Sequence, residues 1–380
     1  MIISNSINQM YEEMKSWRQD LHKIPEIGLE EYETSKYLKG KLDEFKIDYK
    51  AGYSNTGIVA WVKGSKGNSD RSIALRADFD ALPMPEKNEF EHKSTNKGMM
   101  HACGHDGHTS MLLGAAKYLS ENNDFDGTVY FIFQPDEEKT QGAQAMIDDG
   151  LFTKFNIDEV FAFHNLPGMK TGSFASRAGT ITASESLFKI ELWGQGGHSA
   201  LPHMGVDTIT VGSQIINSLQ SIVSRKLNPA VNGVVSVTGF SADGTENVLP
   251  GYALITGDSR SLSPESNKII ESSMKDIVEG IAKAHNIKSS FSYYTRTNMT
   301  TNTADQVDAA MAAARTVVGK DMVDGNCEPK LFSEDFSQMT MVKPGCYILI
   351  GNGTEGAHGQ SLHSSNYDFN DELLLSLIHI

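Results

Sequence analysis

The feature that most constrains the fold is a set of short apolar segments, each of which ends in polar residues. The segments are SIALRADFDALP (72–83), GTVYFIFQPDEE (127–138), EVFAFHNLPG (159–168) and CYILIGNG (346–353). Because they are apolar on both faces and alternate with helical patterns, they predict an α/β sheet covered by helices on both sides. Ligands bind beyond the carboxyl ends of the strands in such sheets. We therefore expect a site where Asp78 and Asp80, Glu137 and Glu138, and His164 meet.

The remaining patterns predict how the chain is divided into domains. Polar amphipathic helices are expected at 9–23 and 29–46, and a buried helix at 110–119. From 182 to 293 the order of strand and helix patterns changes to βαββαβ, the split-βαβ arrangement. The chain of 380 residues is also too long for one ordinary core. We therefore predict that 182–293 is a second domain, inserted into a domain formed by 1–181 and 294–380.

Composition argues against several classes of protein. The net charge is −15 and no cluster of Lys and Arg is present, whereas a nucleic-acid-binding protein usually carries a basic stripe. No apolar run approaches the roughly 20 residues that a membrane helix needs, and the first residues lack the apolar region of a signal peptide. The three cysteines are too far apart for a disulfide framework. These features predict a cytoplasmic protein with no nucleic-acid or membrane partner.

The stretch MHACGHDGHTSM (100–111) concentrates residues that bind transition metals. Similar residues follow in the other polar segments, and together the candidate ligands are Cys103, His105, Glu138, His164 and His363. Cysteine, histidine and carboxylate together suit zinc or a similar divalent ion. Five ligands exceed one tetrahedral site, so the set predicts two neighbouring divalent ions. The same ligands accept Zn, Mn, Co or Ni.

Glu137 and Glu138 are adjacent carboxylates after a buried strand, which is electrostatically unfavourable unless they have partners or solvent. In isolation, a solvated loop is the simpler interpretation. Beside a metal, one carboxylate can be a ligand while the other is the general base for a metal-bound water. A cysteine hydrolase with Cys103 as nucleophile is an alternative, but it leaves both glutamates and His363 without a role. A redox site would need a CxxC pair, which the sequence lacks.

Six motifs resemble, in order, the signatures of the two-metal amidohydrolases related to aminoacylase and carboxypeptidase. They are MHACGHDGHTSMLLGAA, FQPDEE, FAFHN, GQGGHSALPH, ENVLPG and LHSSNYDFND, within about residues 17 to 371. The subgroup includes hippurate hydrolases, N-acyl-amino-acid deacylases and indole-acetyl-amino-acid hydrolases. The resemblance implies a mixed-sheet, di-metal exopeptidase-like catalytic domain with an inserted lid and dimerisation domain. It also implies hydrolysis of the amide bond of N-acyl amino acids or small peptides.

The resemblance implies roles for individual residues of the catalytic domain. The five candidate ligands would hold the two ions, and Glu137 would be the general base. Asp80 would orient a histidine ligand, and Asp78 is a weaker candidate for such a role. His101 and His108 would be structural residues or would support the ligands.

For the inserted domain, the resemblance implies contacts with substrate and with a second subunit. His198 would hydrogen-bond the developing oxyanion in the site of a neighbouring subunit, so a homodimer through the insert is expected. Asn247 and Arg260 would hold the substrate carboxylate, although both also fit ordinary turn and strand-end positions. Asp136 departs from the family pattern, in which alanine usually precedes the paired glutamates.

Two further interpretations use the same ligands. A carboxypeptidase would apply the same chemistry to peptides. A metal-stabilised binding or regulatory protein would have lost catalysis, but it would have no need of Glu137 as a base beside a metal.

Overall fold

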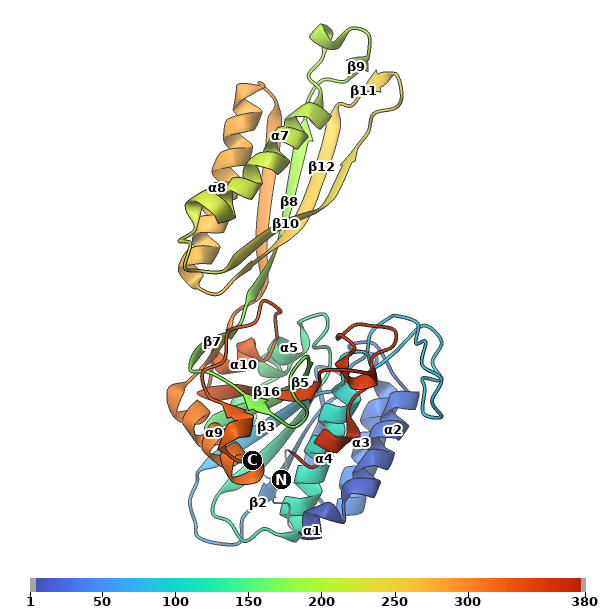
Figure 1. The fold of residues 1–380 in the computed structure, drawn as a ribbon, viewed down its shortest axis with the longest axis vertical. Helices are drawn as coiled ribbons and strands as arrows, with labels where there is room; N and C mark the ends of the chain where they lie inside the picture. Colours follow the sequence, from blue (N-terminus) through green and yellow to red (C-terminus); the bar gives the residue numbers. More distant parts are fainter. Residues whose placement is uncertain (1–4, 377–380) are drawn as a thin grey trace. The chain divides into compact units, whose positions relative to one another are not determined.

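The computed structural model of the chain describes residues 5–376, which belong to two compact units (Figure 1). Unit 1 comprises Met1–Ile181, Thr301–Glu328 and Asp335–Ile380, and unit 2 comprises Thr182–Thr300 and Pro329–Glu334. Unit 2 is larger than the insert expected at 182–293. The difference arises because the last strand of the unit, β13 (Lys288–Thr297), runs past residue 293, and because a short later segment also joins the unit.

An eight-stranded mixed sheet forms the centre of unit 1, in the order β1-β2-β4-β3-β5-β16-β6-β15. The central strands β4, β3, β5 and β16 are parallel to one another, whereas β2 is antiparallel to β1 and β4, and β6 to β16. The strands are β1 (Asp48–Tyr53), β2 (Gly57–Lys63), β3 (Ser72–Asp78), β4 (Thr128–Gln134), β5 (Glu159–Pro167), β6 (Phe174–Ala175), β15 (Val323–Asp324) and β16 (Gly345–Gly353). Two further short strands, β7 (Gly179–Thr182) and β14 (Thr300–Asn302), pair with each other.

Helices cover the sheet, and α4 packs against β2, β3, β4 and β5 while α2 and α3 pack against α4. The helices are α1 (Asn5–Asn8), α2 (Tyr11–Lys23), α3 (Tyr32–Phe45), α4 (His105–Glu121), α5 (Gly142–Asp148), α6 (Leu151–Lys154), α9 (Ala304–Val318) and α10 (Ser337–Thr340), with 3-10 turns η3 (Lys320–Met322), η4 (Ala357–Gly359) and η5 (Asp371–Leu373). Phe131 and Ile132 are neighbours in β4, point to opposite faces and are both fully buried. The predicted α/β fold, with a sheet buried on both faces, is therefore confirmed.

Unit 2 contains a four-stranded antiparallel sheet in the order β10-β12-β8-β13. Its main elements follow the order βαββαβ along the chain: β8 (Ser184–Trp193), α7 (Thr208–Ser221), β10 (Gly233–Ala242), β12 (Tyr252–Ser261), α8 (Pro264–Ala284) and β13. Shorter elements are β9 (Gly197–His198), η1 (Pro202–Met204), the π-helical turn η2 (Ile222–Lys226) and β11 (Val248–Leu249). Buried and half-buried residues alternate along β12, since one face of the sheet packs against α7 and α8.

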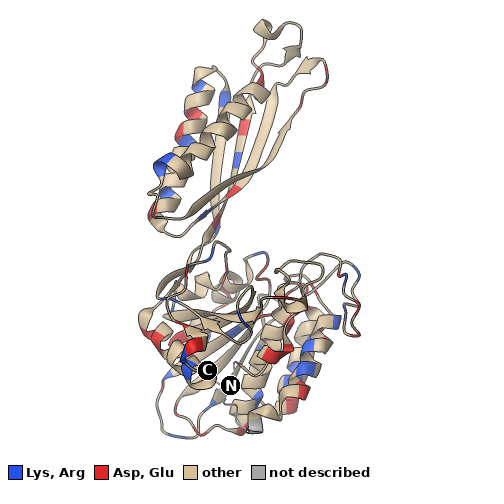
Figure 2. Cartoon of the chain, in the orientation of Figure 1, with Lys and Arg blue, Asp and Glu red and all other residues tan. Residues whose placement is uncertain are grey.

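The surface of both units is charged. Lys and Arg are interspersed with Asp and Glu along the helices (Figure 2). Among the described residues, no helix has the length and hydrophobicity needed to cross a lipid bilayer.

Candidate metal centre

The candidate ligands converge where the parallel strands of unit 1 end. Glu137 and Glu138 follow β4, His164 lies within β5, and His363 lies in the loop after β16. His105 is the first residue of α4, which begins five residues before the helix expected at 110. The helix begins there because Gly104 reverses the chain with φ of 93°, a conformation that disfavours other residues.

Among the described residues, four groups of candidate ligand atoms each lie within 4.8 Å of one another. Two of them are Asp78, His105, His108 and His164, and Glu137, Glu334 and Asp335, and Glu138 belongs to the other two. One group is Cys103, Glu138 and His363, and the other is His105, Glu137 and Glu138. The His363 Nε2 atom lies 3.3 Å from Glu138 Oε1. The Cys103 Sγ atom lies 3.4 Å from His164 Nε2, which brings the fifth candidate ligand to the same place. The structure thus brings the five candidate ligands close together, and their role as metal ligands stays a prediction.

The hydrogen bonds of the two buried histidines leave one nitrogen of each facing the cluster. His164 Nδ1 donates to the carbonyl of Asn165 at 2.7 Å, so Nε2 carries the lone pair in the neutral ring. His105 Nδ1 lies 2.9 Å from the Asp80 carbonyl, and its buried Nε2 has no hydrogen bond within residues 5–376. Metal-binding histidines usually have this arrangement, with the second nitrogen donating to a carbonyl or carboxylate. The sulfur, nitrogen and carboxylate donors therefore fit divalent transition ions.

Asp80 positions two members of the cluster. Its Oδ1 atom lies 3.1 Å from His105 Nδ1, and its Oδ2 atom accepts a hydrogen bond of 3.0 Å from the backbone N–H of Glu138. These contacts are compatible with the orienting role expected for Asp80, which stays a prediction. Asp78 Oδ2 lies 3.8 Å from His105 Nε2, but the carboxylate makes closer contacts elsewhere.

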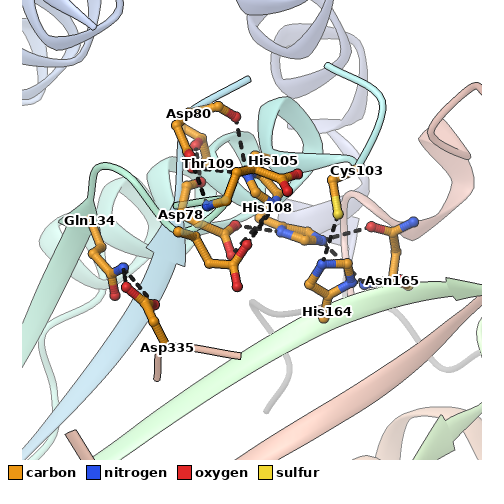
Figure 3. A network of polar contacts seen from close by, with 12 residues as sticks. Asp78, Asp80, Cys103, His105, His108, Thr109, Gln134, His164, Asn165 and Asp335 are labelled. Atoms are coloured by element: carbon orange, nitrogen blue, oxygen red, sulfur yellow. Dashed lines mark hydrogen bonds and ion pairs between the residues drawn. The ribbon is translucent and has the colours of Figure 1, made fainter. Parts of the chain in front are cut away.

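Asp78 belongs to a buried network of polar side chains that surrounds the cluster (Figure 3). Its carboxylate lies 2.6 Å from His108 Nδ1 and 2.7 Å from Arg76 Nη1. Arg76 in turn donates to Asp335 Oδ1 at 2.9 Å, so a buried guanidinium lies between two buried carboxylates and balances their charge. Neither Arg76 nor Asp335 was expected from the sequence. The signal for Arg76 was an arginine within an otherwise apolar strand.

Protons compete with metal for this cluster. Burial and the neighbouring Glu138 carboxylate raise the pKa of the Cys103 thiol. Contacts with Cys103 and Glu138 raise the pKa of His363 to about 10, whereas burial and His108 lower the pKa of His164. A metal must displace the protons on Cys103 and His363, so metal affinity rises with pH.

Asp136, which departs from the family pattern, is fully buried and has a φ of 55°. Neither carboxylate oxygen has a hydrogen-bond partner in the described part of the chain. The side chain fits only because residue 28 is glycine, since a Cβ there would lie 1.7 Å from Asp136 Oδ1. Burial, and then the charge of Asp80, raises the pKa of Asp136 to about 6. The extra carboxyl group is therefore close enough to influence the charge of the centre.

The candidate substrate-binding residues of unit 2 do not form one cluster. His198 is exposed in β9, and its Nδ1 accepts a hydrogen bond of 3.1 Å from the N–H of Ala200. The exposed Asn247 is nearby, because its carbonyl accepts from Ser199 N–H at 3.0 Å. Arg260 lies towards the opposite end of the sheet, where β12 pairs with the first residues of β8.

Arg260 is already engaged within unit 2. Its guanidinium donates to Asp258 at 2.7 Å, to Glu185 at 2.8 Å and to Ser333 at 3.1 Å. These contacts join β12, β8 and the segment 329–334 within the unit. They use three of the five N–H groups of the guanidinium, so two remain for a further acceptor, and the substrate-binding role expected for Arg260 stays a prediction.

Unit 1 also contains a cavity of about 570 Å³ that is separate from the candidate ligands. Residues of α4 and α9 line it together with Ser72, Thr128 and Glu159, which begin β3, β4 and β5. It therefore lies at the amino ends of the parallel strands. None of the candidate ligands lines it.

Comparison with known proteins shows that the chain is similar to enzymes in sequence and in fold. Residues 74–378 match the family model described as Peptidase family M20/M25/M40. A hippurate hydrolase of Campylobacter jejuni is 40% identical over 362 residues, which are 95% of this chain and 93% of the relative. An N-acetyldiaminopimelate deacetylase of Leuconostoc mesenteroides is 33% identical, covering 96% of this chain and 94% of the relative. A crystal structure of a Bacillus subtilis protein, described as a dinuclear metal-binding peptidase, matches with a TM-score of 0.85 and 28% identity over 98% of this chain and 96% of that one.

Proposed function

Because the chain belongs to the peptidase family M20/M25/M40, we propose that it is a two-metal amidohydrolase that cleaves the amide bond of N-acyl amino acids. The observation that carries the proposal is the pair of ligand groups that share Glu138 and have Glu137 beside them. The names of the relatives support the substrate class, since hippurate and N-acetyldiaminopimelate are both N-acyl amino acids.

Two divalent ions would be held by Cys103, His105, Glu138, His164 and His363. When bound, they supply Lewis-acid polarisation of the substrate carbonyl and lower the pKa of a water molecule. Asp80 keeps His105 and the backbone of Glu138 in position for this task.

Glu137 performs the proton transfers. Its side chain is nearly buried, and its Oε2 atom lies 4.0 Å from His105 Nε2, so the carboxylate faces the ligand cluster. It takes a proton from the attacking water while the oxygen adds to the amide carbon. It then delivers that proton to the leaving nitrogen as the C–N bond breaks. The second proton of the water passes from the new carboxyl group to the amine, which gives a carboxylate and an ammonium group.

The function can be tested with a panel of N-acyl amino acids and dipeptides, using metal-loaded and chelator-treated protein. We expect release of free amino acid from N-acyl substrates, loss of activity on chelation, and recovery when a divalent metal is added. Inactivation by a thiol-alkylating reagent without any dependence on metal would instead indicate a cysteine hydrolase. Tight binding of these ligands without turnover would indicate a binding protein, and preferential cleavage of dipeptides a carboxypeptidase.

We further propose that the protein is a homodimer built through unit 2. Large apolar side chains are exposed on this unit around β9, η1, α7, β10 and β11, namely Leu201, Met204, Ile209, Phe240 and Val248. The strand β10, which carries Phe240, is an edge of the sheet. Exposed apolar groups of this kind are typical of protein interfaces.

In such a dimer, His198 would act in the active site of the partner subunit. Its exposed imidazole would donate to the oxyanion that forms when water adds to the amide carbon. We expect His198→Ala to lower kcat by roughly 10²–10³-fold, the usual effect of removing one oxyanion donor, with metal content unchanged. Mixing this variant with Glu137→Gln under conditions of subunit exchange should restore part of the activity, because mixed dimers contain one intact site. No recovery despite proven exchange would rule out a role across subunits.

A further inference from the structure

A buried histidine in unit 1, outside the ligand set, lies between two carboxylates. His22 of α2 is fully buried, with Nδ1 2.8 Å from Asp106 Oδ2 and Nε2 3.1 Å from Glu86 Oε1. An ionised carboxylate only accepts hydrogen bonds, so both ring nitrogens must donate and the ring is an imidazolium. Burial opposes this charge, but Asp106 and then Glu86 outweigh it and raise the pKa of His22 to about 9.

The first carboxylate connects His22 to the amino end of α4. Asp106 is the second residue of α4 and directly follows the candidate ligand His105. Its Oδ2 atom also lies 3.8 Å from Arg18 Nη1, one helical turn before His22. Two cationic groups of α2 therefore hold the end of α4 that carries a metal ligand.

The second carboxylate connects His22 to the loop that carries His363. Glu86 lies in the segment 84–98, and its Oε2 atom accepts a hydrogen bond of 2.6 Å from the N–H of Ser94 in the same segment. The same segment is bonded to the residues after His363. Lys87 N–H donates to the Ser365 carbonyl at 2.9 Å, and Asn88 Nδ2 donates to the Tyr367 carbonyl at 2.8 Å.

We propose that His22 is a positioning residue, a buried cation that joins the α4 end bearing His105 to the loop bearing His363. It makes no contact with a candidate ligand itself, and it acts through Asp106 on one side and Glu86 on the other. These contacts would fix the position of His105 relative to His363, and each of these two residues belongs to one of the two ligand groups that share Glu138. This inference rests on the proposed function, because it assigns these histidines to metal.

Two variants separate the two connections. In His22→Asn the amide nitrogen replaces Nδ1 and can reach only Asp106, and in His22→Gln it replaces Nε2 and can reach only Glu86. We expect each variant to bind Co²⁺ about tenfold more weakly than the wild type, the lower end of the effect of losing a residue that supports metal ligands. We also expect an altered visible absorption spectrum of the bound Co²⁺. Both measurements are made on the full chain, well below the unfolding temperature, and neither depends on activity.

His92→Gln is the matched control. The ring centroid of His92 lies 5.6 Å from that of His22 and 3.9 Å from that of Phe90, on which the ring stacks. The buried Nε2 atom of His92 has no hydrogen-bond partner among the described residues. It should bind Co²⁺ like the wild type. Wild-type affinity and spectrum in folded His22→Asn and His22→Gln would overturn the proposal, even if their unfolding temperatures fell.

If the His22 variants do not fold, Glu86→Gln decides the question. Glutamine keeps the shape of the side chain and one acceptor oxygen but removes the charge that His22 faces. The variant should bind Co²⁺ more weakly than the wild type, as the His22 variants should. Unchanged binding would overturn the proposal. Failure of the proposed function would be distinguishable, because the wild type itself would then bind no Co²⁺ at the cluster or would not hydrolyse N-acyl amino acids.

Discussion

Replacing Glu138 with alanine is expected to abolish activity and to remove both metal ions, whereas His363→Ala should retain about one. The reason is that Glu138 belongs to both groups of ligand atoms, while His363 belongs to one. A carboxylate offers two oxygens and can serve two neighbouring ions, and an imidazole nitrogen can serve only one. Elemental analysis after dialysis gives the metal content of each variant, with the wild type expected to hold two ions.

The matched control is Glu89→Gln, in a residue whose side chain is 87% exposed and which belongs to no ligand group. It should hold as much metal as the wild type. Retention of one full equivalent in Glu138→Ala would show that Glu138 serves a single ion. In that case the second ion would have to be held by ligands other than Glu138.

The carboxyl ends of the parallel strands could be predicted because the strands are buried on both faces. Their apolar runs are nearly continuous, and the polar residues that follow them stand out, so Glu137, Glu138 and His164 could be expected at one edge. The sequence does not show which of these residues belong to the same group of ligand atoms. That Glu138 is common to two groups depends on how the loops after β4 and β16 approach each other.

Residues that act through distant partners could not be predicted. His22 lies in a helix that looks polar and amphipathic, and its burial depends on Asp106, which is 84 positions away. The contacts of Arg260 with Glu185 and Ser333, which are 75 and 73 positions away, could not be predicted either. In both cases the side chain contacts groups that only the tertiary structure brings near it.

Glu137→Gln is expected to lower kcat by about 10³-fold or more, close to the upper range for loss of a general base, while both metal ions stay bound. Glutamine keeps the size of the side chain but cannot take a proton from water at neutral pH. Single-turnover measurements of amino-acid release should show the loss in the chemical step. Metal content and the KM for an N-acyl amino acid should stay close to the wild-type values, because neither depends on a base.

The metal content of Glu137→Gln also distinguishes two roles for Glu137, metal ligand and general base, because its position is compatible with both. Glu137 lies in the same group of ligand atoms as His105 and Glu138, so it has the position of a ligand as well as that of a base. As a ligand, its loss would weaken one ion, and excess metal would restore part of the activity. As a base, its loss would leave the ions in place, and no metal concentration would restore turnover. Near-normal turnover in this variant would exclude both roles and would assign the proton transfer to another group.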